Sequence, residues 1–165
     1  KESERVVTMK ASVLFVCLGN ICRSPTAHGI FKKLVDDAGL NNTVAIDSCG
    51  TGDWHLDHAP DKRAQTAALQ QGFDLSGLRS RLICQADFIR FDYILMMDKK
   101  NLHDVLLLCP EQFKHKCELF LTYANELAVD EVPDPYYGGD DGFEDVIEMI
   151  KVASLNLLKE IQAID

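Results

Sequence analysis

Short apolar runs alternate with longer amphipathic stretches along this chain of 165 residues. The apolar runs predict four short buried strands, at residues 12–16, 44–48, 93–97 and 118–121. Apolar residues at helical spacing predict helices at residues 26–38, 62–71, 85–90, 101–108 and 142–164. Gly39 and Gly72 directly follow the first two of these helices and are expected to end them.

Strands that alternate with helices predict an α/β fold, because parallel strands need crossover connections. We expect three layers, with a four-stranded parallel sheet in the flavodoxin-like order 2-1-3-4 and helices on both faces. A ligand should then bind beyond the carboxyl end of the first strand. We assign residues 9–165 to a single domain. Residues 1–8 are expected to be an upstream extension or an expression remnant, since Met9 begins a segment typical of a natural start.

Residues 17–24 lie between the first predicted strand and the first predicted helix, and they have the composition of an anion site. In a strand–loop–helix segment, the N–H groups of the loop and the positive end of the helix converge on one point. Cys17 supplies a thiol that this positive field would stabilise as a nucleophilic thiolate. Arg23 supplies a planar fork for two phosphate oxygens. The predicted phosphate loop after Cys17 comprises Leu18, Gly19, Asn20, Ile21, Cys22, Arg23 and Ser24.

Other residues of the loop have expected supporting roles. Gly19 and Asn20 both tolerate the positive φ that a tight loop requires. Ser24 either caps the helix or turns its hydroxyl toward the sulfur of Cys17, and Pro25 suits the first helical position. A cysteine and an arginine at this spacing also arise by chance in a chain with six cysteines and 17 basic residues. The pattern is therefore significant only in its strand–loop–helix context.

A second candidate group lies near the C-terminal end, where Asp134 stands between Pro133 and Pro135. The prolines restrict the backbone on both sides of the carboxylate to extended conformations. Cleavage of a phosphate ester by a thiolate needs an acid for the leaving oxygen and then a base for water, and one carboxyl can do both. We interpret Asp134 as this acid and base. The alternative is an ordinary turn with exposed tyrosines.

With these motifs, the chain resembles the low-molecular-weight protein tyrosine phosphatases from about Val13 to the final helix. The resemblance rests on the loop at 17–24, the region of Trp54, and the segments 91–98 and 134–138, which occur in the family's order. It implies phosphatase activity on phosphotyrosine and the corresponding α/β fold.

The resemblance also implies the roles of individual residues. It makes Cys17 the nucleophile that carries a phosphocysteine intermediate, Arg23 the phosphate clamp and Asp134 the general acid and base. It further implies a supporting hydrogen-bond network in which Asn20 and Ser48 take part.

Aromatic residues define the expected substrate. Trp54, Tyr136 and Tyr137 are predicted to form the rim of the site, where a flat aryl phosphate could stack. This favours phosphotyrosine in proteins or peptides, and small aryl phosphates, over phosphoserine. Phosphate-like oxyanions are expected to inhibit. The resemblance implies that Cys22 forms a protective disulfide with Cys17 under oxidation, although a small apolar packing role is the alternative.

The composition of the chain excludes some classes of binding partner and indicates the cellular compartment. The net charge of −9 argues against a nucleic-acid or anionic-membrane partner. No stretch is long and apolar enough to span a bilayer, and the first residues have no signal-peptide core. Six cysteines without secretory context indicate free thiols in the cytoplasm. We expect no cofactor and no metal, because the loop itself supplies the positive field.

Two other functions remain as alternatives. Thioredoxin-coupled arsenate reductases share this fold and loop, but they need two further cysteines that are closely spaced. Here Cys84 stands alone, and Cys109 and Cys117 lie later in the chain. The other alternative has no catalysis: a phosphotyrosine-binding module, or a metal site that uses Cys17, Cys22 and a histidine. The cysteine spacings fit no compact four-ligand zinc pattern.

Overall fold

The computed structural model describes residues 8–53, 55–135 and 140–164. Within these ranges, four parallel strands form one sheet in the order β2-β1-β3-β4. This confirms the predicted α/β class and the strand order 2-1-3-4. The strands are β1 (Ala11–Cys17), β2 (Val44–Gly50), β3 (Tyr93–Met96) and β4 (Cys117–Leu119).

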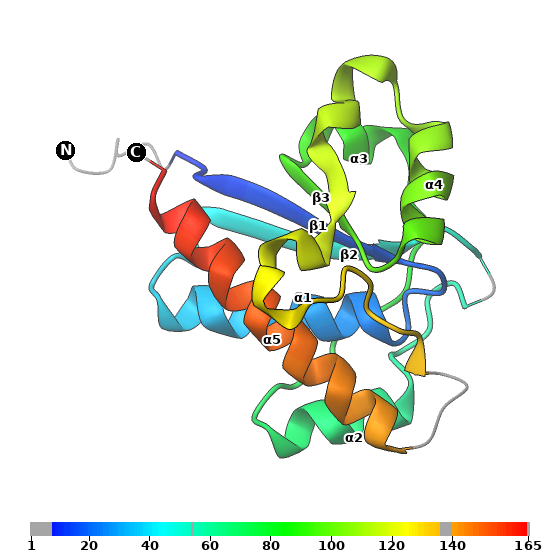
Figure 1. The fold of residues 1–165 in the computed structure, drawn as a ribbon, viewed down its shortest axis with the longest axis vertical. Helices are drawn as coiled ribbons and strands as arrows, with labels where there is room; N and C mark the ends of the chain where they lie inside the picture. The colour runs from blue at the N-terminus through cyan, green and yellow to red at the C-terminus, as the bar shows by residue number, and fades with distance from the viewer. Residues whose placement is uncertain (1–7, 54, 136–139, 165) are drawn as a thin grey trace.

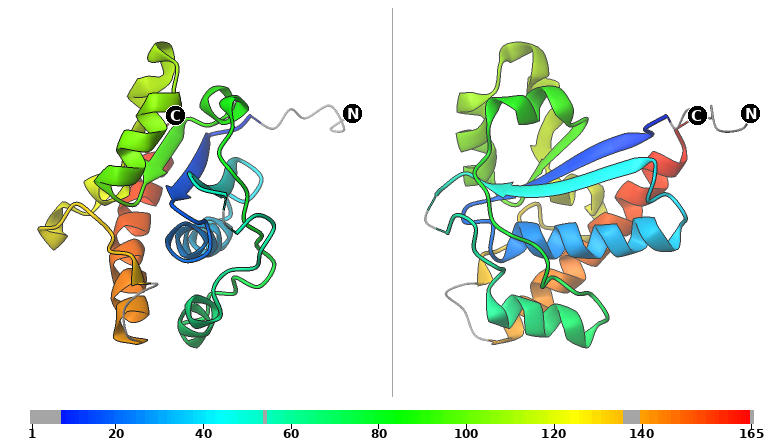
Figure 2. Two further views of the ribbon diagram at one scale, coloured as in Figure 1. Left: turned by 90° about the vertical axis from the view of Figure 1, so that its right-hand side faces the viewer. Right: turned by 180° about the vertical axis from the view of Figure 1, so that it is seen from behind.

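Helices cover both faces of the sheet, which gives the molecule three layers (Figure 1). α1 and α5 pack on one face, with α2 against α5, whereas α3 and α4 lie on the opposite face, as the turned views in Figure 2 also show. The α-helices are α1 (Arg23–Asp37), α2 (Lys62–Gln70), α3 (Gln85–Arg90), α4 (Lys99–Leu108) and α5 (Asp140–Gln162). Short 3-10 helices are η2 (Glu111–Lys116), η3 (Phe120–Tyr123) and η4 (Asn125–Leu127).

Alternate residues of the central strand β1 pack into two separate cores. Val13 and Phe15 belong to the cluster beneath α1 and α5, whereas Leu14 and Val16 belong to the cluster beneath α3 and α4. All four side chains are fully buried. A strand with helices on both faces needs apolar residues at every position. This is why the sequence shows a continuous apolar run here instead of an alternating one.

The start of α1 differs from the prediction. The helix begins at Arg23 instead of residue 26, with Cys22 as its N-cap, so Ser24 does not cap it and Pro25 is its third residue. Proline is still tolerated there, because the N–H groups of a first helical turn have no intrahelical partner. The earlier start places Arg23 and Ser24 on the rigid first turn of a helix.

The other elements agree with the predicted ones to within a few residues. β4 is shorter than predicted, since Phe120 and Leu121 lie in η3. Gly39 and Gly72 have positive φ just after α1 and α2, as expected of glycines that end helices. Within the described ranges, no helix combines the length and the apolar character that crossing a bilayer requires.

Candidate active site

The carboxyl ends of β1 and β3 meet the start of α1 at one edge of the sheet. Cys17 is the last residue of β1, and Arg23 is the first residue of α1. The N–H of Met97 donates to the carbonyl of Val16 at 3.1 Å, so Asp98 emerges from β3 beside the loop. The topology therefore brings a thiol, a guanidinium and a carboxylate to the predicted place.

The segment after β2 holds the backbone of the loop. Thr51 N donates to the carbonyl of Cys17 at 3.0 Å, and Gly52 N donates to that of Leu18 at 2.9 Å. Gly50 comes so close that a Cβ at this position would lie 2.7 Å from the Leu18 carbonyl oxygen. Only glycine fits there without displacing the loop.

Several amide groups of the loop remain available to a ligand. Among the residues that the structure describes, the N–H groups of Gly19, Ile21 and Cys22 have no hydrogen-bond acceptor. They lie immediately before the N-terminus of α1. Amide groups of a loop together with a helix N-terminus form a site for an oxyanion.

Asn20, and not Gly19, adopts the left-handed backbone conformation, with φ of 57°. Of the two residues expected to tolerate a positive φ, Asn20 is the one that adopts it. At Gly19 a Cβ would lie 3.1 Å from the ring of His55, a tight contact that the ring would have to move slightly to relieve. The side chain of Asn20 is held at both ends, since Nδ2 donates to Ser24 Oγ at 2.7 Å and Oδ1 accepts from Arg81 N at 3.0 Å.

The sulfur of Cys17 is buried among hydrogen-bond donors. Asn20 N donates to Cys17 Sγ at 3.2 Å, and Ser24 Oγ lies 3.0 Å from the same sulfur. A thiolate only accepts, and Ser24 Oγ already accepts from Asn20, so the Ser24 hydroxyl is the donor to an ionised sulfur. Both donors are thus positioned on the sulfur itself, where they can bind an ionised acceptor by charge-assisted hydrogen bonds.

Arg23 is a buried cation with acidic partners. Nη1 donates to Asp98 Oδ2 at 2.6 Å and to the carbonyl of Val132 at 2.9 Å, while Nη2 lies 3.8 Å from Asp134 Oδ2. Burial acts to lower the pKa of Arg23, but the negative charges of Cys17, Asp98 and Asp134 together raise it above its usual value. The guanidinium is therefore always charged and is held in one orientation.

Asp134 reaches the site through the backbone that precedes it. Val132 N donates to the carbonyl of Met97 at 2.8 Å, which ties this segment to the end of β3. The bond from Arg23 to the Val132 carbonyl joins positions that are 109 residues apart. The side chain of Asp134 is 34% exposed, so water and a substrate can reach it.

Ser48 lies away from the loop contacts that it was expected to join. It is in the middle of β2, and its Oγ lies 3.0 Å from His28 Nδ1 on α1, instead of contacting Asn20 or Ser24. Burial lowers the pKa of His28 to about 4, so this imidazole is neutral at pH 7. The predicted rim lies outside the described residues: Trp54, Tyr136 and Tyr137.

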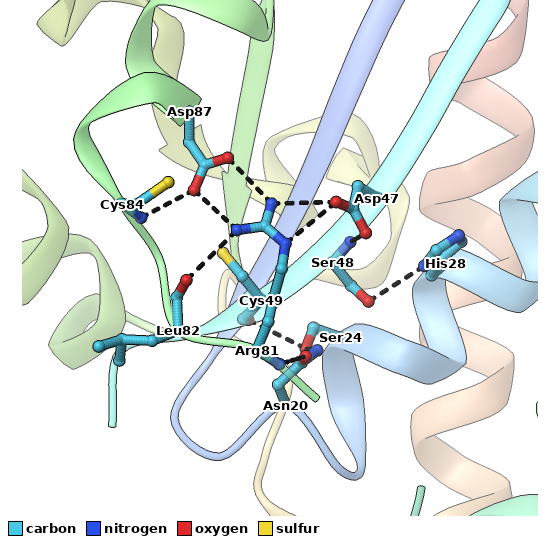
Figure 3. A network of polar contacts seen from close by, with 10 residues as sticks. All are labelled: Asn20, Ser24, His28, Asp47, Ser48, Cys49, Arg81, Leu82, Cys84 and Asp87. Atoms are coloured by element: carbon cyan, nitrogen blue, oxygen red, sulfur yellow. Dashed lines mark hydrogen bonds and ion pairs between the residues drawn. The ribbon is translucent and has the colours of Figure 1, made fainter. Parts of the chain in front are cut away.

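Arg81 supports the loop and was missed by the sequence analysis (Figure 3). Its N–H holds Asn20, and its guanidinium lies between two carboxylates: Nη2 is 3.0 Å from Asp47 Oδ2 and 2.9 Å from Asp87 Oδ1. Burial acts to raise the pKa of Asp87, but bonds from Arg81 and from Cys84 N lower it below its usual value. A fixed charge cluster thus sets the position of the N–H that holds Asn20.

Two supporting residues differ in how far the sequence could have indicated them. Asp98 directly follows a predicted strand, and the rule that parallel carboxyl ends share one edge could have placed it at the site. Arg81 lies in an irregular segment that pairs with Gly50 through backbone hydrogen bonds. No pattern in the sequence predicts that pairing. Among the described residues, no group of three or more His, Cys, Asp or Glu side chains could hold a metal ion.

Comparison with known proteins agrees with this geometry. The family model described as low molecular weight phosphotyrosine protein phosphatase matches residues 12–164. The chain belongs to this family.

Similar members of this phosphatase family come from distant organisms. The chain is 43% identical over 156 residues to the low molecular weight phosphotyrosine protein phosphatase of Schizosaccharomyces pombe, covering 94% of this chain and 99% of the relative. It is 42% identical over 150 residues to a putative low molecular weight protein-tyrosine-phosphatase of Synechocystis, covering 90% and 95%. A crystal structure of the protein tyrosine phosphatase from Entamoeba histolytica, with Hepes in its active site, superposes with a TM-score of 0.89 at 38% identity, covering 92% and 97%.

Asp98→Asn should lower the free energy of unfolding by about 2 kcal/mol, because it removes the nearer of two carboxylates that pair with a buried arginine. Asparagine is as good an N-cap as aspartate, so the cap of α4 is preserved. The measurement is urea unfolding in phosphate-free buffer. The matched control is Asp104→Asn on the same helix, which removes only a pair with exposed Lys100 and should cost less than about 1 kcal/mol. Equal stability of the two variants would contradict the role of Asp98.

Proposed function

We propose that this protein hydrolyses aryl phosphate monoesters, chiefly phosphotyrosine in proteins or peptides, through a phosphocysteine intermediate. The observation that carries the proposal is the position of Cys17 Sγ. It receives donors from Ser24 and Asn20 inside a loop that also holds Arg23, and Asp134 lies next to that arginine. The names of the relatives support the reaction, and Hepes in the active site of the Entamoeba protein is a sulfonate, an anion that resembles a phosphate ester.

The proposed first step is an in-line attack of the Cys17 thiolate on phosphorus. Arg23 and the amide groups of the loop stabilise the charge on the non-bridging oxygens. Asp134 gives its proton to the leaving tyrosyl oxygen as the P–O bond breaks. In the second step, Asp134 takes a proton from the water that attacks the phosphocysteine. Phosphate leaves, and the Cys17 thiolate and the Asp134 carboxylic acid are regenerated.

The depth of the loop supports the choice of substrate. Cys17 is only 3% exposed, so the phosphorus of a substrate must travel to the bottom of the loop. The long aryl arm of phosphotyrosine reaches this depth, whereas the short side chain of phosphoserine does not. Stacking against Trp54, Tyr136 and Tyr137 remains a prediction. Phosphate-like oxyanions should compete for the same amide groups.

We also propose the cytoplasm as the working compartment. Attack requires a reduced Cys17, and all six cysteines are free thiols in the structure. Reducing compartments keep thiols in this state. An arsenate reductase would need a pair of thiols able to reach Cys17, and in the part of the chain that the structure describes the hydrogen-bond partners of Cys17 Sγ are Ser24 Oγ and Asn20 N, with no thiol among them.

Cys17→Ser should still bind a phosphotyrosine peptide but should lose turnover by roughly a thousandfold or more, because serine is a far weaker nucleophile at neutral pH. Turnover of an aryl phosphate and peptide binding are measured on the same preparation, with and without a chelator. The chelator should change nothing in the wild type. The phosphocysteine mechanism would be refuted if Cys17→Ser kept turnover close to that of the wild type. It would also be refuted if the chelator abolished the turnover of the wild type.

Asp134→Ala should slow hydrolysis of phosphotyrosine by roughly a hundredfold, because tyrosine is a poor leaving group without an acid. p-Nitrophenyl phosphate, whose leaving group needs little protonation, should be slowed much less. Asp130→Asn is the matched control from the same segment, since Asp130 forms an exposed ion pair with Lys99. If both esters slow equally, Asp134 is not the acid.

Cys22→Ser should make inactivation by mild peroxide irreversible, whereas dithiothreitol should restore the wild type. Cys22 is 5% exposed at the N-cap of α1, and burial raises the pKa of its thiol well above the usual range. It is therefore protonated at rest and is not the thiol that peroxide attacks first, which leaves Cys17 as the proposed site of first oxidation. Recovered activity is the measurement, and Cys84→Ser, which removes an exposed thiol, is the control. Full recovery of Cys22→Ser would exclude a protective disulfide.

A further inference from the structure

Two thiols outside the candidate active site lie side by side. Cys109 Sγ and Cys117 Sγ are 3.9 Å apart. Cys109 is the C-cap of α4, and Cys117 is the first residue of β4. Pro110 and the 3-10 helix Glu111–Lys116 form the short connection between them. The fold thus returns the chain so that two cysteines eight positions apart meet.

This pair is at the opposite end of the sheet from the phosphate loop. Cys117 pairs in register with Ile94, and Ile94 pairs with Leu14, whereas Cys17 lies farther along β1. The separation along the strands alone is about 10 Å at ~3.3 Å per residue. Two strand spacings across the sheet add to it. The pair therefore cannot exchange directly with Cys17, and its chemistry is separate from the proposed catalytic cycle.

We propose that Cys109 and Cys117 form an oxidation site, in which hydrogen peroxide or a small disulfide such as oxidised glutathione joins the two sulfurs. The sulfurs need to approach only from 3.9 Å to the roughly 2 Å of a disulfide bond. The short connection and rotation of the two side chains allow this movement without a change of topology.

The reaction balances without any group outside the pair and the oxidant. The Cys117 thiolate attacks hydrogen peroxide, which breaks the O–O bond and gives a sulfenic acid and hydroxide; the proton that the Cys117 thiol released converts this hydroxide into water. The Cys109 thiolate then attacks the sulfenic sulfur and displaces a second hydroxide, which takes up the proton that the Cys109 thiol released and becomes the second water. With oxidised glutathione, two successive exchanges release two molecules of glutathione instead. The two cysteines lose two electrons in either case.

The surroundings indicate which sulfur reacts first. Cys117 is partly exposed, whereas Cys109 is 6% exposed, so an oxidant meets Cys117 first. Burial raises the pKa of the Cys117 thiol to about 12, with Cys109 acting in the same direction, while the positive charges of Lys116 and Lys114 oppose this. The pair should therefore respond to sustained oxidant instead of a brief pulse, unlike an activated catalytic thiol.

A Cys109–Cys117 disulfide would anchor α4, one of the helices that supports the active site. A disulfide would join the end of α4 to β4, and the other end of α4 is capped by Asp98, the partner of Arg23. The bond would restrict the unfolded chain and leave the loop of Cys17 untouched. Oxidation at this site should stabilise the protein without blocking the phosphate site.

The first test uses the full chain with the substitution Cys17→Ser. This substitution removes the thiol of the proposed nucleophile, which would otherwise compete for the oxidant. The protein is treated with oxidised glutathione at mildly alkaline pH, free thiols are alkylated, and trypsin digestion follows without reductant. Cleavage after Lys114 and Lys116 places the two cysteines on separate peptides, 101–114 and 117–151. A disulfide joins these peptides into one species whose mass is their sum less two hydrogen atoms. Dithiothreitol should separate them.

The controls make each outcome decisive. Cys84, an exposed thiol, reports that the oxidant worked by forming a mixed disulfide with glutathione. Cys117→Ser in the same background should abolish the joined species. If Cys84 is modified while Cys109 and Cys117 carry only the alkyl group or glutathione, the proposal is overturned.

A thermal measurement tests whether closure suits the fold. For a loop of this length, the oxidised protein should melt higher than the reduced protein by roughly 5–10 °C. The shift should be absent in Cys117→Ser, and inorganic phosphate should raise the melting temperature of oxidised and reduced protein equally. An unchanged or lower melting temperature after oxidation would contradict the proposed Cys109–Cys117 disulfide. So would an oxidised protein whose melting temperature no longer rises when phosphate is added.

Discussion

The buried positive charge of Arg23 is the constraint on which the rest of the site depends. A buried guanidinium must be paired, because an uncompensated charge in the interior costs several kcal/mol. Its partners come from distant parts of the chain: Asp98 follows β3, and the carbonyl of Val132 belongs to the segment that precedes Asp134. Satisfying one cation therefore assembles the phosphate loop, the start of α4 and the proposed acid at one edge of the sheet.

The loop is supported from a second direction by a network that is also built around an arginine. Arg81 lies between Asp47 and Asp87, and its backbone N–H holds Asn20 in the left-handed conformation (Figure 3). Asn20 in turn orients Ser24 toward the sulfur of Cys17. The phosphate loop is thus supported by two arginines, the buried Arg23 and the half-buried Arg81. Arg23 lies within the loop and is the proposed phosphate clamp, and Arg81 fixes the backbone of the loop from outside.

An acidic protein can hold a phosphate because the field in a pocket is local. The net charge is −9, and carboxylates flank Arg23 itself. Charges more than about 10 Å away across water are largely screened at physiological salt, whereas amide groups and a helix N-terminus act at contact distance. The net charge therefore argues against nucleic acids and anionic membranes as partners, but it does not determine whether the loop binds a small anion.

Local patterns in the sequence were enough to predict the α/β class and the segment that carries the proposed nucleophile. These patterns are a continuous apolar run for a strand covered on both faces, helical periodicity, and a cysteine and an arginine at a strand–helix junction. The strand order was predicted as the flavodoxin-like one, which the structure confirms. The start of α1 was predicted three residues too late. Which of Gly19 and Asn20 takes the positive φ could not be read from the sequence, because the loop is held by contacts with Gly50, Thr51 and Gly52, which lie outside it.

Only the tertiary structure decided which distant residues support the loop. Ser48 pairs with His28 instead of Asn20, Arg81 takes the supporting place, and Cys109 meets Cys117. Each of these contacts depends on the register of neighbouring segments and on the direction of side chains after packing. A pattern along the chain records which face of an element is apolar. It does not record which polar groups on two different elements come within about 3 Å of each other.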